Sequence, residues 1–376
     1  MENLRNEQAV FDKNGVLAQM ESLRLANGAF VAAPTEDYKA LWLRDTLYAS
    51  FAYWYLGQYD KLKQGIQIVF DIFRKHRHKI VKRLTSPVDL PEGTLHAKYN
   101  PDTLEEITEY WAHKQWDALG LFLHIVADLD FKNVFVVRDE DDREILQDIV
   151  NYLRSTEYWQ NPDFGMWEEC EIRHASSIGS VVGGLSYIKR RRLAVVADPL
   201  IQFGEETLRK ILPQESPNHC LKPHHSHDCD AAQLSLIWPY NIISREEADN
   251  ILARLLKEHD SEFPRHGEKH QLSRGHGLNR FWGDDYYRSN EGKHTGVSAE
   301  WPMFKFWVSI IYSQRRDYEK AGQWFQKGCK EISGNMIPEA YQNDRPNDHT
   351  PLAWAHAIAL IAFQKLSAEL RQKFTA

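Results

Sequence analysis

The sequence predicts an all-α protein whose helices pair as six hairpins. Apolar residues recur every three or four positions in about twelve segments of the 376-residue chain, and little of it alternates as a strand does. The connections between these segments are alternately long and short. Hairpins of this kind can close into a ring, with every long connection at one end and every short turn at the other.

The expected helices run along the whole chain. The first covers residues 7–25, and Asn27 and Gly28 end it. Asp230 is expected to cap the segment that begins there, with Gln233 as its partner three residues on. The other periodic segments are residues 43–56, 58–75, 115–129, 141–156, 174–188, 199–212, 230–238, 246–258, 298–313, 317–332 and 350–367.

The long connections are the expected place for function. Long loops without secondary structure are usually functional in a compact domain. Residues 1–376 are expected to form a single domain, because no stretch rich in Pro, Gly or Ser divides them. The six long connections are residues 25–42, 76–114, 157–173, 213–229, 259–297 and 333–349.

Composition excludes several classes of protein. Hydrophobic residues make up 43% and charged residues 26%, as in a soluble globular chain. A net charge of -7 argues against a nucleic-acid partner, which needs a basic surface. The chain has no apolar run of signal-peptide type and none long enough to span a membrane, so no membrane partner is expected. The chain has four cysteines, Cys170, Cys220, Cys229 and Cys329, which are too few and too unevenly spread for a disulfide framework. We therefore expect a cytoplasmic protein.

Aromatic residues make up 12% of the chain, including 12 Trp, and many lie beside charged residues. Sugar-binding sites have this character, because a pyranose offers apolar C–H faces to aromatic rings and hydroxyls to Asp, Glu and Arg. The alternative is that the tryptophans fill a large helical core. Most of them are expected to do so.

The acidic stretch from Asp163 to Glu171 is a candidate for acid catalysis. An acid that protonates a leaving group near neutral pH needs a raised pKa, which apolar contact and neighbouring negative charge both produce. Trp167 beside Glu168, with Glu169 and Glu171 near it, provides both influences. The alternative is a helix start with acids in its first turn.

A second cluster joins the first long connection to the next helix. Tyr38, Trp42, Arg44 and Asp45 combine aromatic rings with an adjacent cation and anion, which can both bind sugar hydroxyls. Alternatively, Asp45 is a helix N-cap and Arg44 is solvated. Similar clusters at other loop ends contain Trp111, Gln115, Asn279, Arg280, Asp284, Glu300, Trp301 and Glu339.

Taken in order, these motifs resemble glycoside hydrolase family 15, the glucoamylase family. Two further phrases, Ala299 to Phe304 and Asp230 to Ser235, are similar to the related alpha subunit of phosphorylase kinase. The resemblance implies an (α/α)6 barrel and the hydrolysis of terminal α-glucosyl residues with inversion. It rests on Trp42-x-Arg44-Asp45, Gln115-x-Asp117, Trp167-Glu168-Glu169, Arg280 with Asp284 and Tyr286, and Pro338-Glu339.

The resemblance also implies roles for individual residues. Glu168 corresponds to the general acid and Glu339 to the general base. The chain departs from the family pattern at Gly165, where an Asp is usual, and at His113-Lys114, where Arg-Pro is usual. The substrate-binding residues implied are Tyr38, Trp42, Arg44, Asp45, Trp111, Gln115, Glu169, Arg280, Asp284 and Trp301.

One further segment is rich in metal-ligand types, but its spacing matches no common zinc pattern. A loop rim near a helix cap explains it adequately, so neither a metal nor another cofactor is expected. The residues are His219, Cys220, His224, His225, His227, Asp228, Cys229 and Asp230.

Two classes of function therefore remain. One is an exo-acting, inverting α-glucosidase that takes small oligosaccharides, for which both Glu168 and Glu339 are present. The other is a glucoside-binding or regulatory protein without turnover. Hydrolysis of maltose, isomaltose, kojibiose, nigerose or trehalose distinguishes them.

Overall fold

Six helices are buried on every side, and this property places them in an inner layer. The computed structural model describes residues 10–86, 91–218, 220, 225–256, 272–273, 275–284, 286, 299–342 and 344–375. The inner helices are α2 (Leu43–Leu56), α5 (Trp116–Phe131), α7 (Ala175–Arg191), α9 (Leu234–Ile237), α11 (Met303–Gln314) and α13 (Ala353–Lys365).

Six other helices are amphipathic and cover the inner layer. In α3, for example, Leu62, Ile66, Val69 and Phe73 bury one face at helical spacing, while charged residues occupy the other. These outer helices are α1 (Lys13–Glu21), α3 (Tyr59–Lys75), α6 (Glu140–Ser155), α8 (Asp198–Ile211), α10 (Arg245–Leu256) and α12 (Tyr318–Cys329).

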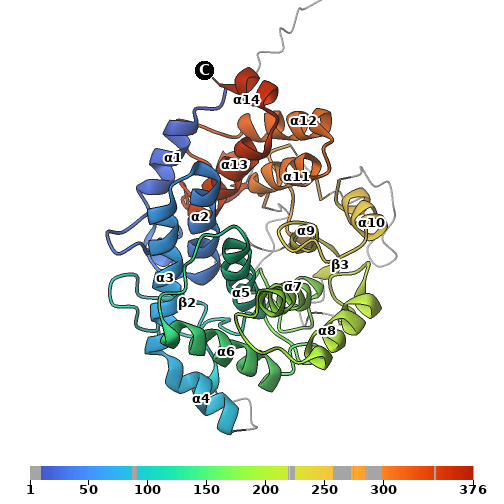
Figure 1. The fold of residues 1–376 in the computed structure, drawn as a ribbon. Coiled ribbons are helices and arrows are strands. Elements are labelled where there is room, and N and C mark those ends of the chain that lie inside the picture. Colours follow the sequence, from blue (N-terminus) through green and yellow to red (C-terminus); the bar gives the residue numbers. More distant parts are fainter. Residues whose placement is uncertain are drawn as a thin grey trace, which may run out of the picture.

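The inner helices form a closed ring. In chain order, α2, α5, α7, α9, α11 and α13 each pack against the next, and α13 returns to pack against α2. Figure 1 looks down this ring and shows the outer helices around it. Near the two ends of the chain, Phe11 N donates a 2.8 Å hydrogen bond to Phe374 O.

Glycine permits the closest helix contact in the ring. A Cβ on Gly120 of α5 would lie 2.4 Å from the backbone of Ser180 in α7. Ser180 Oγ also donates a 2.7 Å hydrogen bond to the carbonyl of Asp117 in α5. The two backbones therefore approach more closely than any larger side chain would allow.

Aromatic rings fill the centre of the ring. Tyr48 of α2 stacks on Trp354 of α13 at 5.3 Å, and its edge contact with Trp307 of α11 is at 5.5 Å. Trp238, which follows α9, packs at 5.7 Å against Trp307. Four inner helices are therefore joined by one aromatic cluster, in agreement with the expected core role of most tryptophans.

Three short antiparallel strand pairs lie in the described parts of the long connections, and two of these pairs join one connection to another. Further single bridges join Leu278 to Trp301 and Glu300 to Tyr341. One-turn 3-10 helices at Glu36–Tyr38 and Pro91–Gly93 lie in the same connections, and a third at Ala231–Gln233 directly precedes α9. The strand pairs are β1 (Leu41–Trp42) with β2 (Lys98–Tyr99), β3 (Ser226–Asp230) with β4 (Phe281–Trp282), and β5 (Tyr341–Gln342) with β6 (Arg345–Pro346).

The predicted helical layout is confirmed, with differences at particular elements. Residues 7–9, 257–258 and 298 of the expected helices lie outside the described residues. The segment at 230–238 divides into a 3-10 turn and α9, and Asp230 caps that turn by accepting Ala232 N at 2.8 Å. Two helices were not expected, α4 (Arg77–Thr85) and α14 (Ala368–Phe374). In the described part of the chain, every helix is too short or too polar to span a membrane.

Candidate active site

A cavity of about 320 Å³ opens among the long connections, and both Glu168 and Glu339 line it. Five of the six connections, or the helix turns that follow them, contribute to its wall. The cavity therefore lies at the end of the ring where function was expected. Its other lining residues are Ala32, Tyr38, Trp42, Arg44, Asp45, Trp111, Met166, Trp167, Glu169, Arg280, Tyr286, Trp301, Leu352 and Trp354.

The connection that contains Glu168 is a closed loop, and the helix-start interpretation of residues 163–171 is wrong. Asp163 and Ile172 exchange two backbone hydrogen bonds of 3.0 Å, and α7 begins only at Ala175. The Asp163 carboxylate accepts Trp116 N at 3.1 Å and Ser177 Oγ at 2.8 Å. Burial raises the pKa of Asp163 to about 6. This side chain therefore fixes the loop to the first turns of α5 and α7.

Two residues of the loop have left-handed backbone conformations. Gly165 has φ 62°, and a Cβ there would lie 2.7 Å from the ring of His174. Only glycine fits this position without displacing His174, which explains the departure from the family pattern. Glu168 also has φ 62°, a conformation uncommon for residues with side chains. The turn at Glu168 is therefore specified by the surrounding contacts and not by local preference.

Glu168 lies at the cavity wall, and 13% of its side chain is exposed. Trp111 Nε1 donates a 2.5 Å hydrogen bond to Glu168 Oε2, and Arg44 Nη1 lies 3.5 Å from Oε1. Burial raises the pKa of Glu168, whereas Arg44 and Trp111 favour the charged form and oppose the rise. The side chain thus keeps its proton to a higher pH than an exposed glutamate.

The raised pKa was predicted from apolar contact and neighbouring negative charge, and burial is the larger cause. Glu169 forms an ion pair with Arg280 at 2.8 Å, and Glu171 forms one with Lys114. The Trp167 indole donates its hydrogen bond to Asp230 at 2.7 Å. Because the acids adjacent in sequence are neutralised by other partners, loss of water around Glu168 is the main cause.

Glu339 is surrounded by hydrogen-bond donors. Tyr38 Oη donates to its Oε1 at 2.7 Å, while Tyr286 Oη and Asn347 Nδ2 donate to its Oε2 at 2.5 and 2.7 Å. Burial raises the pKa of both tyrosines well above the usual value, so they remain donors. The three donors fix the orientation of the Glu339 carboxyl group in the cavity.

Arg44 is fixed at the cavity wall. Its Nε and Nη2 pair with Asp117 at 2.8 and 3.1 Å, and Nη2 also donates to Gln115 Oε1 at 2.8 Å. The guanidinium is 4% exposed. A solvated Arg44 is therefore excluded, and this buried pair positions the remaining Nη1 toward Glu168.

Asp45 faces the same cavity as the third residue of α2, whose N-cap is Trp42. The N-cap interpretation of Asp45 is therefore wrong. Burial raises the pKa of Asp45 to about 7; Arg44 lowers it, and Glu168 and Glu339 raise it. Its carboxyl group is thus sensitive to both glutamates and titrates near neutrality.

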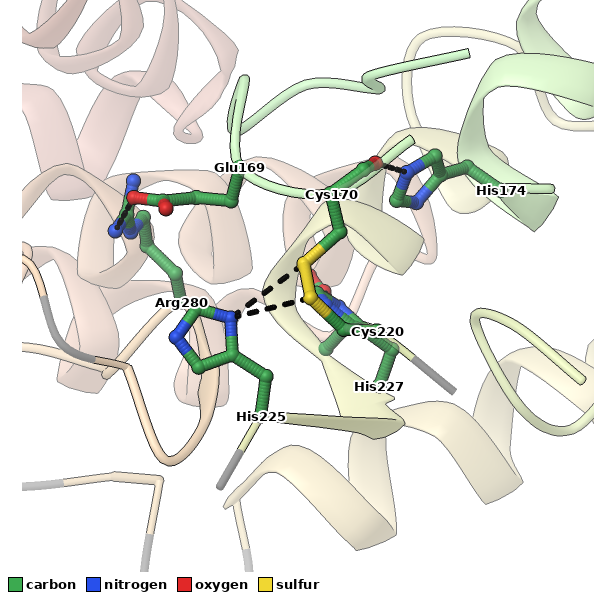
Figure 2. Close-up of a disulfide and its surroundings, with 8 residues drawn as sticks. Glu169, Cys170, His174, Cys220, His225, His227 and Arg280 are labelled. Atoms are coloured by element: carbon green, nitrogen blue, oxygen red, sulfur yellow. Dashed lines mark hydrogen bonds and ion pairs between the residues drawn. A yellow bond between two sulfur atoms is a disulfide. The ribbon is translucent and has the colours of Figure 1, made fainter. Parts of the chain in front are cut away.

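Arg280 forms the opposite wall. It pairs with Asp284 at 2.7 and 2.9 Å and with Glu169 at 2.8 Å, as Figure 2 shows for Glu169. The guanidinium lies over the rings of Tyr286 and Trp301 at 5.0 and 5.3 Å. A cation fixed among aromatic rings resembles the mixed polar and apolar surface that a sugar requires.

The structure brings most of the predicted residues together. Both glutamates and eight of the ten substrate-binding candidates line the cavity, but Gln115 and Asp284 lie behind it and bind the two arginines. Asn347 and Trp354 were not expected in the site. Trp354 lies just after the last long connection, as Trp42 lies at the end of the first. Its position in the sequence could therefore have indicated that it lines the cavity. Tyr286 was noted only as part of a motif.

Cys170 and Cys220 form a disulfide bond that joins the Glu168 loop to the segment before β3. This disulfide was not expected from the sequence, in which 50 residues separate the two cysteines. Cys229 and Cys329 are buried as free thiols.

Comparison with known proteins agrees with this architecture. A probable phosphorylase b kinase regulatory subunit alpha of Caenorhabditis elegans is 25% identical over 389 residues, covering 85% of this chain and 30% of that protein. The chain thus spans about 30% of the length of the curated relatives that it matches.

Solved structures show the same helical toroid. A glycosidase variant in complex with glucose has a TM-score of 0.76 and 20% identity, covering 94% of this chain and 95% of its own. The glucoamylase from Saccharomycopsis fibuligera has a TM-score of 0.66 and 14% identity, covering 98% of both chains. The model of the family "Glycosyl hydrolases family 15" matches residues 12–325. This protein therefore belongs to glycosyl hydrolase family 15.

Proposed function

We propose that the protein is an inverting, exo-acting α-glucosidase that releases β-glucose from the non-reducing end of short α-glucosides. The observation that carries the proposal is a pair of glutamates on one cavity, of which Glu339 accepts three hydrogen bonds and Glu168 has a pKa raised by burial. Inversion needs one carboxylic acid to protonate the leaving oxygen and one carboxylate to activate water on the opposite face of the sugar.

Glu168 is the general acid in this proposal. Burial raises its pKa, so it retains a proton to donate. The Trp111 hydrogen bond fixes Oε2 and stabilises the carboxylate that remains after donation. Arg44 Nη1, 3.5 Å from Oε1, stabilises the same charge. Both contacts therefore favour the product of proton transfer.

Glu339 is the general base. Its three donors stabilise a carboxylate and orient it, and both tyrosines line the cavity. A water molecule bound beside this carboxylate would give up its proton as it attacks the anomeric carbon.

The terminal sugar is proposed to bind between Asp45 and the aromatic wall. The raised pKa of Asp45 shows that its carboxyl group is poorly solvated, and sugar hydroxyls would supply the missing hydrogen bonds. The chain's similarity to a glycosidase that has been solved with glucose supports a ligand of this class. Five of the six long connections, or the helix turns that follow them, line the cavity, and this arrangement favours the end of a substrate over its interior.

A second candidate function is supported by a separate observation. The curated relatives carry the description of regulatory subunits. The alternative is therefore a glucoside-binding protein in which the same cavity binds sugar without turnover.

The first prediction is that the purified protein hydrolyses at least one of maltose, isomaltose, kojibiose, nigerose and trehalose. Glu168→Gln should lower kcat by roughly 10²- to 10⁴-fold, because the leaving group loses its proton donor, while sugar binding persists. Glu171→Gln is the matched control, since Glu171 pairs with Lys114 outside the cavity wall. Sugar binding without hydrolysis of any disaccharide would favour the regulatory alternative.

A second prediction concerns pH. Activity should fall as rising pH removes the Glu168 proton. Trp111→Phe deletes a hydrogen bond that favours the charged form, so the pKa of Glu168 should rise. The alkaline limb of kcat/KM against pH should then move to higher pH, whereas Trp324→Phe on α12 should leave it in place. An alkaline limb that stays in place or moves to lower pH in Trp111→Phe would exclude Glu168 as the acid.

The third prediction separates function from stability at Asp45. Asp45→Asn should lower kcat/KM by roughly ten- to a hundredfold, which corresponds to the loss of one charged hydrogen bond. Because the pKa rises from 3.8 to about 7 on folding, ionised Asp45 destabilises the fold above that range.

The Asn variant should therefore have a higher Tm than the wild type at pH 8. The gain should shrink as the pH falls toward 4, where Asp45 is protonated in the folded protein and becomes protonated in the unfolded chain as well. A lower Tm with unchanged kcat/KM would show that Asp45 has only a structural role.

A further inference from the structure

Two cysteines and two histidines meet beside the Glu168 loop. One ligand-type atom from each of Cys170, Cys220, His225 and His227 lies within 4.8 Å of all the others. All four residues are buried. Figure 2 shows Cys170 on the loop after Glu169, whereas Cys220 and His225 precede β3 in the chain and His227 lies within β3.

His225 approaches both sulfur atoms. Its Nδ1 lies 3.5 Å from Cys170 Sγ and 3.8 Å from Cys220 Sγ. In a tetrahedral zinc site with Zn–S near 2.3 Å and Zn–N near 2.0 Å, a nitrogen and a sulfur ligand are roughly 3.6 Å apart. The two distances from His225 Nδ1 therefore match the nitrogen–sulfur spacing of such a site, and zinc binding would require the two sulfur atoms, which are bonded to each other here, to separate.

His227 is oriented as a metal ligand would be. Its Nδ1 is 2.8 Å from Asp230 Oδ2, and its side chain is only 1% exposed. The other ring nitrogen, Nε2, is buried and has no hydrogen-bond partner among the described residues. A carboxylate on one nitrogen and a metal on the other is the usual arrangement around a ligating histidine.

We propose that Cys170, Cys220, His225 and His227 bind one zinc ion when both cysteines are thiolates. Two sulfur and two nitrogen ligands suit tetrahedral zinc, and four protein ligands leave no open position, as in structural sites. The zinc-bound form and the disulfide use the same two sulfur atoms, so they exclude one another. The sequence analysis led to the expectation that no metal is bound, and this proposal revises that expectation.

The site would stabilise the candidate active site without taking part in its chemistry. Cys170 follows Glu168 and Glu169 directly along the loop, and Asp230 accepts both His227 Nδ1 and Trp167 Nε1. The ion would therefore join the loop to β3 on one side, as Asp163 joins it to α5 and α7 on the other.

Spacing alone could not indicate this site. The ligands from β3 and the residues before it fall within one short segment, but Cys170 lies 50 residues before Cys220. Two neighbouring candidates, His219 and His224, lie outside the described residues. Cys229 and Asp228, although close in sequence, are not part of the cluster.

The experiment is to express the whole chain without a polyhistidine tag and purify it with a thiol reductant and no chelator. Mass spectrometry of the metals should find one zinc ion per chain. Cys170 and Cys220 should resist alkylation until a chelator removes the metal. Cobalt(II) in place of zinc should give the visible absorption of a tetrahedral site with two thiolates, a measurement that needs no variant and no enzymatic activity.

His227→Ala and Cys220→Ser should lose the zinc, whereas Cys329→Ala, a buried cysteine on α12, should keep it. Zinc-free protein under reducing conditions, or a wild-type zinc content in His227→Ala, would overturn the proposal. A Cys170–Cys220 disulfide found by peptide mapping of the reductant-treated protein would also overturn it. These readouts do not depend on the proposed hydrolysis, so either idea can fail alone.

Discussion

The site depends on one electrostatic constraint, which is that the carboxyl groups of two glutamates line the same small cavity. Two ionised carboxylates in such a place would repel each other and lose their hydration. The structure avoids this by giving them unlike surroundings. Glu339 accepts three hydrogen bonds, whereas burial raises the pKa of Glu168. The proposed division into base and acid rests on these contacts.

The ring of helices makes such surroundings possible. Arg44 and Asp117 lie in the first turns of α2 and α5, where two adjacent inner helices meet, and their buried pair sets the position of the charge nearest Glu168. A cation left without its partner in this place would be strongly destabilising. The aromatic cluster beneath the cavity, which includes Tyr48 and Trp307, closes the ring and excludes water from below.

Much of the fold could be predicted because its determinants are local. Helical periodicity located the six inner and six outer helices, and the alternation of long and short connections placed the site at one end of the ring. The helix α4 was missed because its sequence is largely basic and buries only three residues. Gln115 and Asp284 were placed in the cavity because a motif cannot distinguish a residue that lines a wall from one that supports it. Asn347 and Cys170 find their partners only through the tertiary structure, so no spacing pattern could reveal them.

The assignment of acid and base is tested most directly by the configuration of the first product. An active α-glucosidic disaccharide should be hydrolysed inside the spectrometer, with proton NMR spectra recorded before mutarotation equilibrates the anomers. If Glu168 donates the proton and Glu339 activates water, β-glucose must appear first. Initial α-glucose, or a glycosyl group trapped covalently on either glutamate, would contradict the assignment and the inverting mechanism.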